Sequence, residues 1–311
     1  MMLINLLSRK KIRSFIICFI SIILIYDSFR LTSNHLSGRY NFDGFNNETG
    51  VDSLIIPNII HFIRFNQTNF SFTEIINIRA VHLAQQPDTI YIHTNVDQFQ
   101  GKYWLLLQQK WPDTYKLIQI KPRSVPVEIY GRPLNTSYNL HHASDIERAR
   151  ILSEYGGIYL DCDVYVIQSL DRFRKYEMVL NWDEGQFMGS QVLLAHKDAR
   201  FLRLWLDTFH DYRSDLWYYN GGELPTTAVL DKYPHLIHRV KLLFGADLKF
   251  ASYLFTKNWS EWKNYYAMHV LIDHRSYMFK ENFEKYPEFN ETMIVNYNFT
   301  FGEMLRKVYF Q

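Results

Sequence analysis

Two aspartates, Asp161 and Asp163, flank a single cysteine within an otherwise apolar and aromatic stretch of the chain. Aspartates two residues apart share one face of an undistorted strand. Unpaired carboxylates on such a strand are costly unless a cation or a polar ligand meets them. Because Mg²⁺ and Mn²⁺ take hard oxygen ligands, the pair predicts a divalent-cation site that also meets a phosphate group.

A helix and a glycine turn precede the two aspartates. Ser144 and Glu147 have the spacing of a capping box, so the helix is expected to begin at Ser144. The Gly-Gly pair that follows it ends the helix, because glycine takes the left-handed conformation that closes a helix. The apolar residues 158–160 and 164–167, on either side of the aspartates, predict one strand.

Strands and helices are expected to alternate along the rest of the chain. The predicted strands cover 58–63, 89–94, 116–120, 177–182 and 192–195, and the predicted helices 73–86, 99–111 and 199–212. Residues 125–142 are interpreted as a loop. Such alternation predicts an α/β fold, with a mostly parallel, Rossmann-like sheet flanked by helices. Ligands of these sheets lie beyond the carboxyl ends of the strands, where the two aspartates fall.

Composition excludes some classes of partner and bond. The net charge is only +2 and the basic residues are scattered, which argues against nucleic acid as a partner. The two cysteines, Cys18 and Cys162, are placed too differently to pair, so no disulfide within the chain is expected. Cys162 is expected to point into the core. None of these features indicates an oligomeric state.

The N-terminus predicts a membrane anchor. Four basic residues between positions 9 and 13 precede a short uncharged run at 14–26. The basic cluster places residue 1 in the cytoplasm, and no Ala-x-Ala cleavage site follows the run. We therefore predict a cytoplasmic tail at 1–11, a transmembrane signal anchor at 12–28, a flexible stem at 29–53 and a lumenal globular domain at 54–311. A cleaved signal peptide is the alternative.

Glycosylation motifs point to the same compartment. Asn-x-Ser/Thr occurs at Asn47, Asn66, Asn69, Asn135, Asn258, Asn290 and Asn298. Sequons of this kind are carried on exposed loops of secretory-pathway proteins. Together with the anchor, they predict a single-pass type II protein of the Golgi or endoplasmic reticulum membrane, with N-linked glycans.

The opening motif resembles a known family. Asp145-x-x-Arg148, Leu152 and Tyr155-Gly-Gly-Ile-Tyr-Leu-Asp161-x-Asp163 together resemble the Asp-x-Asp (DXD) sugar-binding region of retaining glycosyltransferases. These are the family 32-like enzymes, which include yeast mannosyltransferases and α1,4-galactosyltransferases. Ile56-Pro-Asn-Ile-Ile-His61 is similar to their first strand, and Ala267-x-His269 with Ser276-Tyr277 to their C-terminal His…Ser-Trp segment. Two departures are Tyr277, where the family has Trp, and residues 220–225, which match its Thr-Gly-Pro turn only loosely.

The resemblance implies a GT-A fold that binds a nucleotide sugar and Mn²⁺ or Mg²⁺, with a UDP-sugar favoured over GDP-mannose. It implies four catalytic residues, Asp145, Arg148, Asp161 and Asp163. The implied donor-binding residues are His61, Asp145, Arg148 and Asp161, and the implied metal ligands are Asp163, Asp161 and His269. Acceptor or transition-state contacts are expected from Asp183, Glu184 and Gln191, in the loop at 183–191.

The sequence thus predicts a retaining, metal-dependent glycosyltransferase (a hexosyltransferase). It would move a hexose or N-acetylhexosamine to a glycan, glycolipid or glycoprotein acceptor with an α-linkage. The alternative is a catalytically inactive, lumenal glycan-binding protein on the same fold. A glycosidase is disfavoured, because Asp161 and Asp163 point the same way and cannot flank a scissile bond.

Structural roles remain open for the same residues. Asp145 could be a first-turn acid that pairs with Arg148, and the two motif aspartates could be turn residues at a strand end. His269 could be a structural histidine with satisfied hydrogen bonds.

Overall fold

The computed structural model describes residues 40–134 and 138–311. One compact unit runs from Gly44 to Gln311, and the chain up to Asp43 forms a separate unit. Residues 44–53, expected as flexible stem, therefore belong to the globular unit. Among them, the side-chain amide of Asn47 donates to Glu177 Oε2 at 3.0 Å and is buried. The globular domain begins at Gly44 and not at residue 54.

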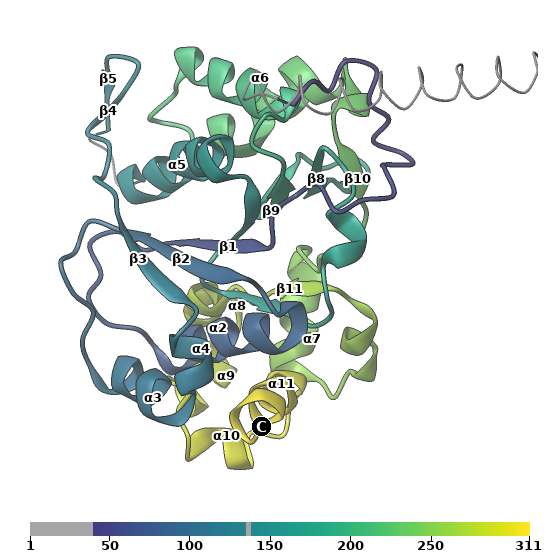
Figure 1. The fold of residues 1–311 in the computed structure, drawn as a ribbon. Helices are drawn as coiled ribbons and strands as arrows, with labels where there is room; N and C mark the ends of the chain where they lie inside the picture. Colours follow the sequence, from purple (N-terminus) through teal and green to yellow (C-terminus); the bar gives the residue numbers. More distant parts are fainter. Residues whose placement is uncertain (1–39, 135–137) are drawn as a thin grey trace, which may run out of the picture. The chain divides into compact units, whose positions relative to one another are not determined.

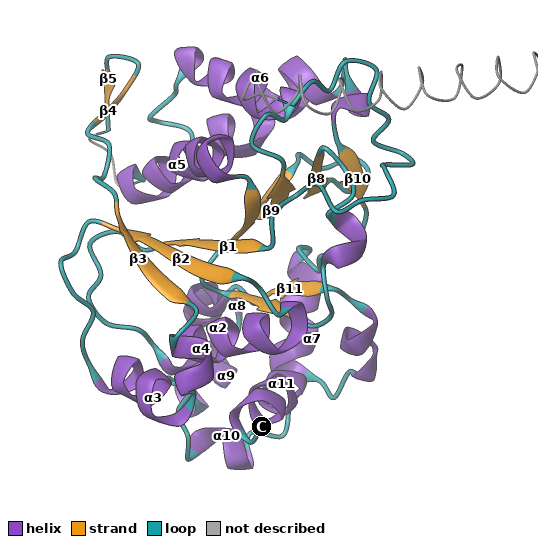
Figure 2. Ribbon diagram, in the orientation of Figure 1, coloured by secondary structure: helices purple, strands orange, loops and turns teal. Residues whose placement is uncertain are grey.

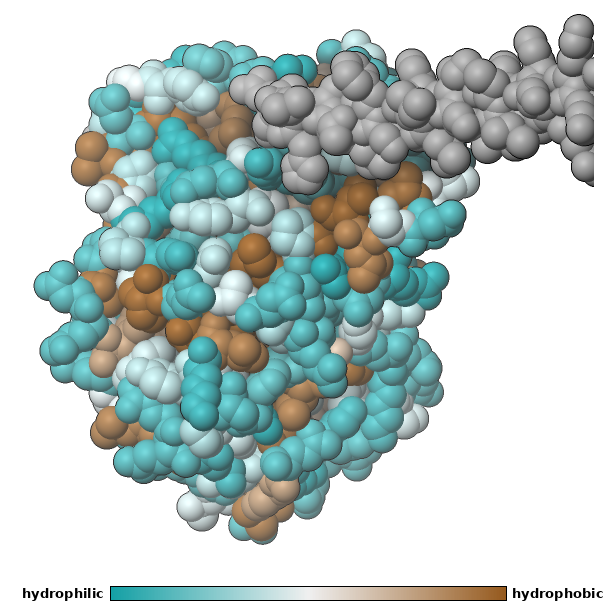
Figure 3. All heavy atoms as spheres, viewed as in Figure 1, coloured by the Kyte–Doolittle hydropathy of each residue, from teal (hydrophilic) through white to brown (hydrophobic). Residues whose placement is uncertain are grey.

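The predicted tail (1–11), the signal anchor (12–28) and residues 29–39 of the predicted stem lie outside the described residues. Within residues 40–134 and 138–311, no helix is both long and apolar enough to cross a membrane. The face of the molecule seen in Figure 3 is mostly hydrophilic, with apolar side chains gathered in small separate groups.

A seven-stranded sheet forms the centre of the larger unit, in the order β10-β8-β9-β6-β1-β2-β3 (Figure 1). The strands are β1 (Ile59–Ile63), β2 (Thr89–Thr94), β3 (Ile118–Pro122), β6 (Gly157–Leu160), β8 (Met178–Asn181), β9 (Gly189–Ala195) and β10 (His238–Val240). β1 pairs in parallel with β2 and β6, β2 with β3, and β8 with β10. β9 runs antiparallel to β6 and β8. The mostly parallel α/β sheet predicted from the alternation of elements is confirmed.

Helices cover both faces of this sheet (Figure 2). The α-helices are α2 (Phe72–Gln85), α3 (Lys102–Lys110), α4 (Pro112–Tyr115), α5 (Asn139–Tyr155), α6 (Arg200–Thr208), α7 (Leu248–Thr256), α8 (Arg275–Met278), α9 (Lys280–Lys285), α10 (Met293–Asn296) and α11 (Thr300–Tyr309). One buried apolar cluster joins the sheet to α2, α7 and α11. A second cluster joins the other face to α5 and α6. The sheet is thus fixed from both sides, which gives its strand ends a rigid support.

Two smaller pairs of strands complete the fold. β7 (Val164–Val166) pairs antiparallel with β11 (Ala267–His269), outside the main sheet. β4 (Glu128–Ile129) and β5 (Arg132–Pro133) form a hairpin inside the stretch expected to be a loop. α5 also begins in that stretch, since its first residues, from Asn139, pack through His142 onto Tyr212.

Candidate active site

The two motif aspartates lie in a turn and not on one continuous strand. β6 ends at Leu160, the amide of Asp161 donates to Gln191 O of β9 at 3.0 Å, and the amide of Val164 donates back to Asp161 O at 3.0 Å. The chain thereby leaves the main sheet and starts β7. The expectation of one strand across 158–167 is wrong, because β7 pairs with a segment about a hundred residues later in the chain.

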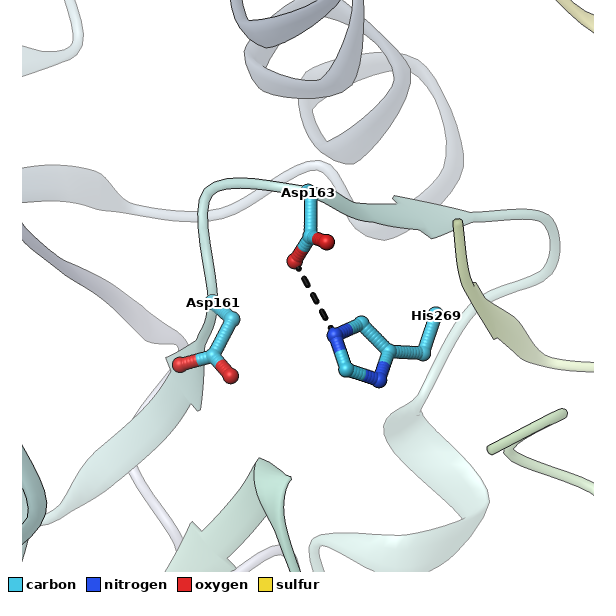
Figure 4. A group of neighbouring side chains, drawn as sticks. All are labelled: Asp161, Asp163 and His269. Atoms are coloured by element: carbon cyan, nitrogen blue, oxygen red, sulfur yellow. Dashed lines mark ion pairs between the residues drawn. The ribbon is translucent and has the colours of Figure 1, made fainter. Parts of the chain in front are cut away.

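The turn and β11 bring His269 to the two aspartates. His269 pairs with Val164 in the small sheet, and the amide of Val270 donates to Asp163 O at 3.0 Å. His269 Nε2 lies 3.2 Å from Asp163 Oδ1. Asp161, Asp163 and His269 can each offer one ligand atom within 4.8 Å of the others. Figure 4 shows their side chains around a common space, with the Asp163–His269 ion pair dashed.

Asp163 and His269 stabilise each other's charged form. Burial raises the pKa of Asp163, but the neighbouring imidazole of His269 outweighs burial and holds the pKa below its usual value. Burial lowers the pKa of His269, and the Asp163 carboxylate more than reverses this effect. Asp163 is therefore ionised at neutral pH, and its charge faces the common space.

These three side chains fit a divalent cation. Two carboxylates and an imidazole are hard and borderline ligands, the combination that suits Mn²⁺ or Mg²⁺ completed by phosphate oxygens or water. Ligand atoms that share such an ion lie at most about 4.2 Å apart, because each bond is about 2.1 Å long. The ligand atoms of Asp161, Asp163 and His269 lie within 4.8 Å of one another, so a small rotation of the side chains is enough to bring them within that limit.

The helix before the turn adds a second pair of charges. Arg148 Nη2 lies 3.1 Å from Asp145 Oδ1 and 3.5 Å from Asp161 Oδ1. The Tyr159 hydroxyl donates to the same Asp161 oxygen at 2.7 Å. Since both contacts of Asp161 use Oδ1, its other oxygen, Oδ2, is left to meet a ligand. The guanidinium thus links the helix pair to the metal-side cluster.

Burial controls the protonation of the helix pair. It raises the pKa of Asp145 to about 6, against the opposing effect of the Arg148 guanidinium. It would lower the pKa of Arg148, but Asp161, Tyr159 and Asp145 together raise it. Arg148 therefore stays charged, and Asp145 is mostly ionised at neutral pH. The three carboxylates of the site, Asp145, Asp161 and Asp163, outnumber its two cationic side chains, Arg148 and His269, and a divalent cation would offset the difference.

The predicted capping box at Ser144 is absent, because α5 already begins at Asn139. Ser144 lies inside the helix, where its carbonyl accepts from Arg148 Nε at 3.2 Å. Glu147 is instead paired with Arg123 and Arg150. Tertiary packing of the first turn thus overrides a cap that the local sequence would allow.

Several residues of the site were not predicted from the sequence. Arg148 Nη1 donates to both the carbonyl and the hydroxyl of Ser190, each at 2.8 Å. The Tyr218 hydroxyl donates to Met188 O at 2.6 Å, and burial together with the nearby Asp145 carboxylate raises the pKa of Tyr218 to about 12. The only signal for this segment was the Asn-Gly-Gly at 220–222, read as a loose match to a family turn.

The glycine at position 221 is required by a close approach. A Cβ on Gly221 would lie 2.7 Å from Asp145 Oδ2. Gly221 belongs to a π-helical turn, Tyr219–Glu223, a rare geometry that recurs at functional sites. The backbone of this turn therefore closes over the Asp145 carboxylate and fixes its position.

Of the three residues expected to meet the acceptor, the structure brings only Gln191 to the cluster. Gln191 follows Ser190 in β9, and its carbonyl accepts from the amide of Asp161. Its side chain is buried, and Nε2 has no hydrogen-bond partner among the described residues. Asp183 instead accepts from the amide of Leu242 at 2.7 Å. Glu184 forms an exposed pair with Lys241.

His61 does not join the site, so the expected donor contact finds no support in its placement. It lies in the middle of β1 with no exposed surface. Its Nε2 bonds Gly156 O at 2.8 Å, and its Nδ1 lies 3.0 Å from His93 Nε2. Because the Gly156 carbonyl oxygen can only accept, His61 Nε2 donates to it. The other ring nitrogen, His61 Nδ1, therefore accepts from His93 Nε2. We interpret His61 as a packing residue that holds the turn before β6.

One sequon asparagine contradicts the expectation of exposed carrier sites. Asn47 is 3% exposed, and its side chain is bonded to Glu177 and to His235 O. Asn135 lies outside the described residues. The other sequon asparagines are exposed or half-buried, namely Asn66, Asn69, Asn258, Asn290 and Asn298. Cys162 is free, and its Sγ contacts Ile63 O at 3.5 Å while it packs against the main apolar cluster.

Residues 76–180 match the family described as "Glycosyltransferase sugar-binding region containing DXD motif". The matched range contains α5, β6 and the turn with Asp161 and Asp163. Residues 76–180 are thus similar to the sugar-binding region of DXD glycosyltransferases. Their Asp-Cys-Asp tripeptide is the DXD motif, and the resemblance drawn from the sequence is confirmed. His269 and Gln191 lie beyond the matched range.

Two curated relatives are similar over part of their length. The chain is 25% identical to glucan organizing enzyme 1 of Cryptococcus neoformans over 150 residues, which cover 45% of this chain and 38% of that protein. It is 27% identical to an uncharacterized protein of Arabidopsis thaliana over 175 residues, which cover 56% of this chain and 27% of that protein. The matches thus span about a third of the length of these relatives.

Solved glycosyltransferase structures are also similar. The galactosyltransferase LgtC, in complex with donor and acceptor sugar analogs, is 14% identical with a TM-score of 0.43, covering 75% of this chain and 98% of that chain. The PaToxG glycosyltransferase is 14% identical with a TM-score of 0.40, covering 81% of this chain and 87% of that chain.

Proposed function

We propose that this protein is a metal-dependent, retaining glycosyltransferase of the DXD type, and that it transfers a hexose or N-acetylhexosamine from a nucleotide sugar to a glycan, glycolipid or glycoprotein acceptor. One observation carries the proposal. Asp161 and Asp163 of the matched sugar-binding region converge with His269 within 4.8 Å, next to the ion pair of Asp145 and Arg148. The GT-A fold belongs to this proposal, and the mostly parallel sheet supports it.

Asp161, Asp163 and His269 would hold Mn²⁺ or Mg²⁺. When bound, the cation would act as a Lewis acid that offsets the negative charge growing on the leaving diphosphate. The protein's own contribution is to fix these three ligands at the edge of a rigid sheet. Arg148 adds a permanent positive charge next to the same position.

Asp145 and Asp161 are placed to orient the sugar. Carboxylates accept hydrogen bonds from hydroxyl groups. Asp145 is anchored by Arg148 and covered by the backbone of Gly221, so it cannot turn away. Such fixed placement of the reacting sugar is worth several kcal/mol of the barrier. Gln191, whose buried amide Nε2 has no partner in the described structure, is the group we assign to the acceptor side of the sugar.

Retention of configuration, and hence an α-linked product, is proposed from the family resemblance of the sequence motif. The lumenal, type II placement in the Golgi or endoplasmic reticulum membrane is proposed from the N-terminal sequence and the sequons. Protease treatment of intact microsomes tests that placement. Protection of the C-terminal domain until detergent is added would support it, and digestion without detergent would refute it.

A donor-hydrolysis screen tests the activity. The purified chain is incubated with Mn²⁺ and, in turn, UDP-galactose, UDP-N-acetylglucosamine, UDP-glucose and GDP-mannose, and release of the free sugar is measured. We expect one donor to be hydrolysed by the wild type and not by Asp163→Asn. Asp215→Asn is the matched control, because Asp215 is exposed and its ion pair within the described part of the chain is with the exposed Arg213.

Absence of hydrolysis and of binding with every donor would refute the enzyme and favour the glycan-binding alternative. Acceptors are then screened with the active donor. The name of the fungal relative makes glucan oligosaccharides the first acceptors to try.

A further inference from the structure

A second hollow lies beside the candidate active site. It is an open pocket of about 520 Å³, within the roughly 300–1,000 Å³ range of small-molecule sites. It is formed where β8 and β10 end and where the loop before β9 turns back, against the π-helical turn Thr226–Leu230. The side chains that give it its chemistry are Trp182, Glu184, Phe187, Asp231 and Arg239.

The lining suits a hexopyranose ring. Phe187 is 45% exposed and presents an aromatic surface to the pocket, as the apolar face of a sugar requires. The Arg239 guanidinium stacks over Trp182 at 4.0 Å from the ring centroid. Arg239 offers donors, while Glu184 and Asp231 offer acceptors. Because both signs of charge are present, the pocket fits a neutral ligand with many hydroxyl groups better than it fits a phosphate.

The pocket lies along the same sheet edge as the motif aspartates. Asp161 follows β6 and Trp182 follows β8, with only β9 between these strands. Neighbouring strands are about 4.8 Å apart, so the two positions are about 10 Å apart along the edge. The backbone of Met188 separates them, held by Tyr218 on the Asp161 side and by Thr226 Oγ1 on the pocket side. A chain of linked sugars could therefore occupy both.

Two unpartnered polar atoms lie at this edge, between the two sites. Gln191 Nε2 in β9 and Asn181 Oδ1 at the end of β8 are buried, and neither has a hydrogen-bond partner among the described residues. A donor and an acceptor left without partners in a buried setting cost free energy unless a ligand meets them. They complement the hydroxyl groups of a sugar, each of which both donates and accepts.

We propose that this pocket is an acceptor subsite that binds a hexopyranose residue one or two units away from the residue that is glycosylated. The proposal rests on the glycosyltransferase activity proposed above, and it makes the acceptor an oligosaccharide and not a single sugar. Gln191 and Asn181 lie along the path from the reacting residue, and Phe187 stacks on the distal ring.

The test compares acceptor length. With the active donor, KM is measured for a monosaccharide glycoside and for the matching di- and trisaccharide, in the gluco, manno and galacto series. We expect the wild type to use a longer acceptor with a KM at least about tenfold lower than the monosaccharide. Phe187→Ala should remove most of that advantage by raising the KM of the longer acceptor alone, since truncating an interface aromatic commonly costs about tenfold or more.

Phe310→Ala is the matched control, because Phe310 is 64% exposed and follows α11, which packs on the face of the sheet opposite to the cluster that contains Trp182 and Leu230. The proposal is refuted if the wild type shows no dependence on length in any series, or if Phe187→Ala keeps the full dependence. Asp231→Asn provides a second, isosteric variant that should weaken the longer acceptor in the same way.

Binding separates the subsite from the transfer reaction. Saturation-transfer NMR with the same oligosaccharides needs no turnover. If no donor is hydrolysed but the oligosaccharides bind and Phe187→Ala weakens them, the activity fails and the subsite stands. If a donor is hydrolysed but the distal ring receives no saturation, the subsite fails and the activity stands.

Discussion

Replacing Arg148 by methionine should destabilise the protein in a pH-dependent way. Arg148 is 6% exposed, and its guanidinium contacts Asp145, Asp161 and Ser190. Methionine fills a similar volume but leaves the buried Asp145 carboxylate without its cation. Removing one partner of a buried ion pair typically costs about 3–5 kcal/mol of the free energy of unfolding, because the other charge is left uncompensated.

The pH dependence follows from Asp145. Burial raises its pKa to about 6 in the folded chain, from 3.8 in the unfolded reference. Between these values the folded state binds the proton and the unfolded state does not, so stability falls as pH rises. In the wild type this fall ends near pH 6. In Arg148→Met the pKa of Asp145 lies higher still, so the fall continues, by about 1.4 kcal/mol per pH unit.

Urea unfolding at pH 5.5 and pH 8 measures this effect. The cost of Arg148→Met should be clearly larger at pH 8, and adding Asp145→Asn should recover about 2 kcal/mol or more at that pH. Ser190→Ala, which removes one neutral hydrogen bond of Arg148, should cost about 1 kcal/mol at both pH values. Arg213→Met, at an exposed surface pair, should change nothing. An equal cost of Arg148→Met at both pH values, or no recovery in the double variant, would contradict the reasoning.

Three further predictions concern other parts of the fold. Burial lowers the pKa of His61 to about 4 and of His93 to about 3, below the usual 6.5. The free energy of unfolding should therefore fall as pH drops below 6.5, because the unfolded histidines bind protons that the folded ones do not. In denaturant titrations, His93→Phe should lessen this fall between pH 7 and pH 5 by about 2 kcal/mol, and an unchanged fall would count against buried neutral histidines. Glycopeptide mass spectrometry of the secreted domain should find Asn47 without a glycan, since its amide is buried, and substantial occupancy there would contradict the fold of residues 44–53. Gly221→Ala should reduce donor hydrolysis by at least about tenfold by displacing the Asp145 carboxylate, and unchanged hydrolysis would show that this close approach has no role.

The local part of the site was predictable from the sequence. The alternation of apolar runs gave β2 at residues 89–94, with the bounds that the structure has. The Gly-Gly pair places the end of α5 and the start of β6, since Gly156 and Gly157 both have positive φ. The spacing of Asp145, Arg148 and Asp161 was therefore sufficient to bring these residues to one strand end.

The non-local part was not predictable. His269 reaches Asp163 only because β11 pairs with β7, and nothing in the local pattern of either segment specifies that partner. Ser190 and Gly221 belong to the site because they contact Arg148 and Asp145 of α5. The spacing of apolar residues along the chain does not predict such tertiary contacts. The predicted donor contact of His61 finds no support for another reason. A histidine on a buried strand has the same sequence pattern whether it faces a ligand or a neighbouring ring.

The most direct test of the cation site is an Mn²⁺ titration followed by electron paramagnetic resonance, with a nucleoside diphosphate present. If Asp161, Asp163 and His269 hold the cation, the wild type binds one Mn²⁺ per chain, and Asp163→Asn and His269→Gln each weaken binding by at least about tenfold, while Asp215→Asn binds as the wild type does. Equal Mn²⁺ affinity in the wild type, Asp163→Asn and His269→Gln would contradict the site.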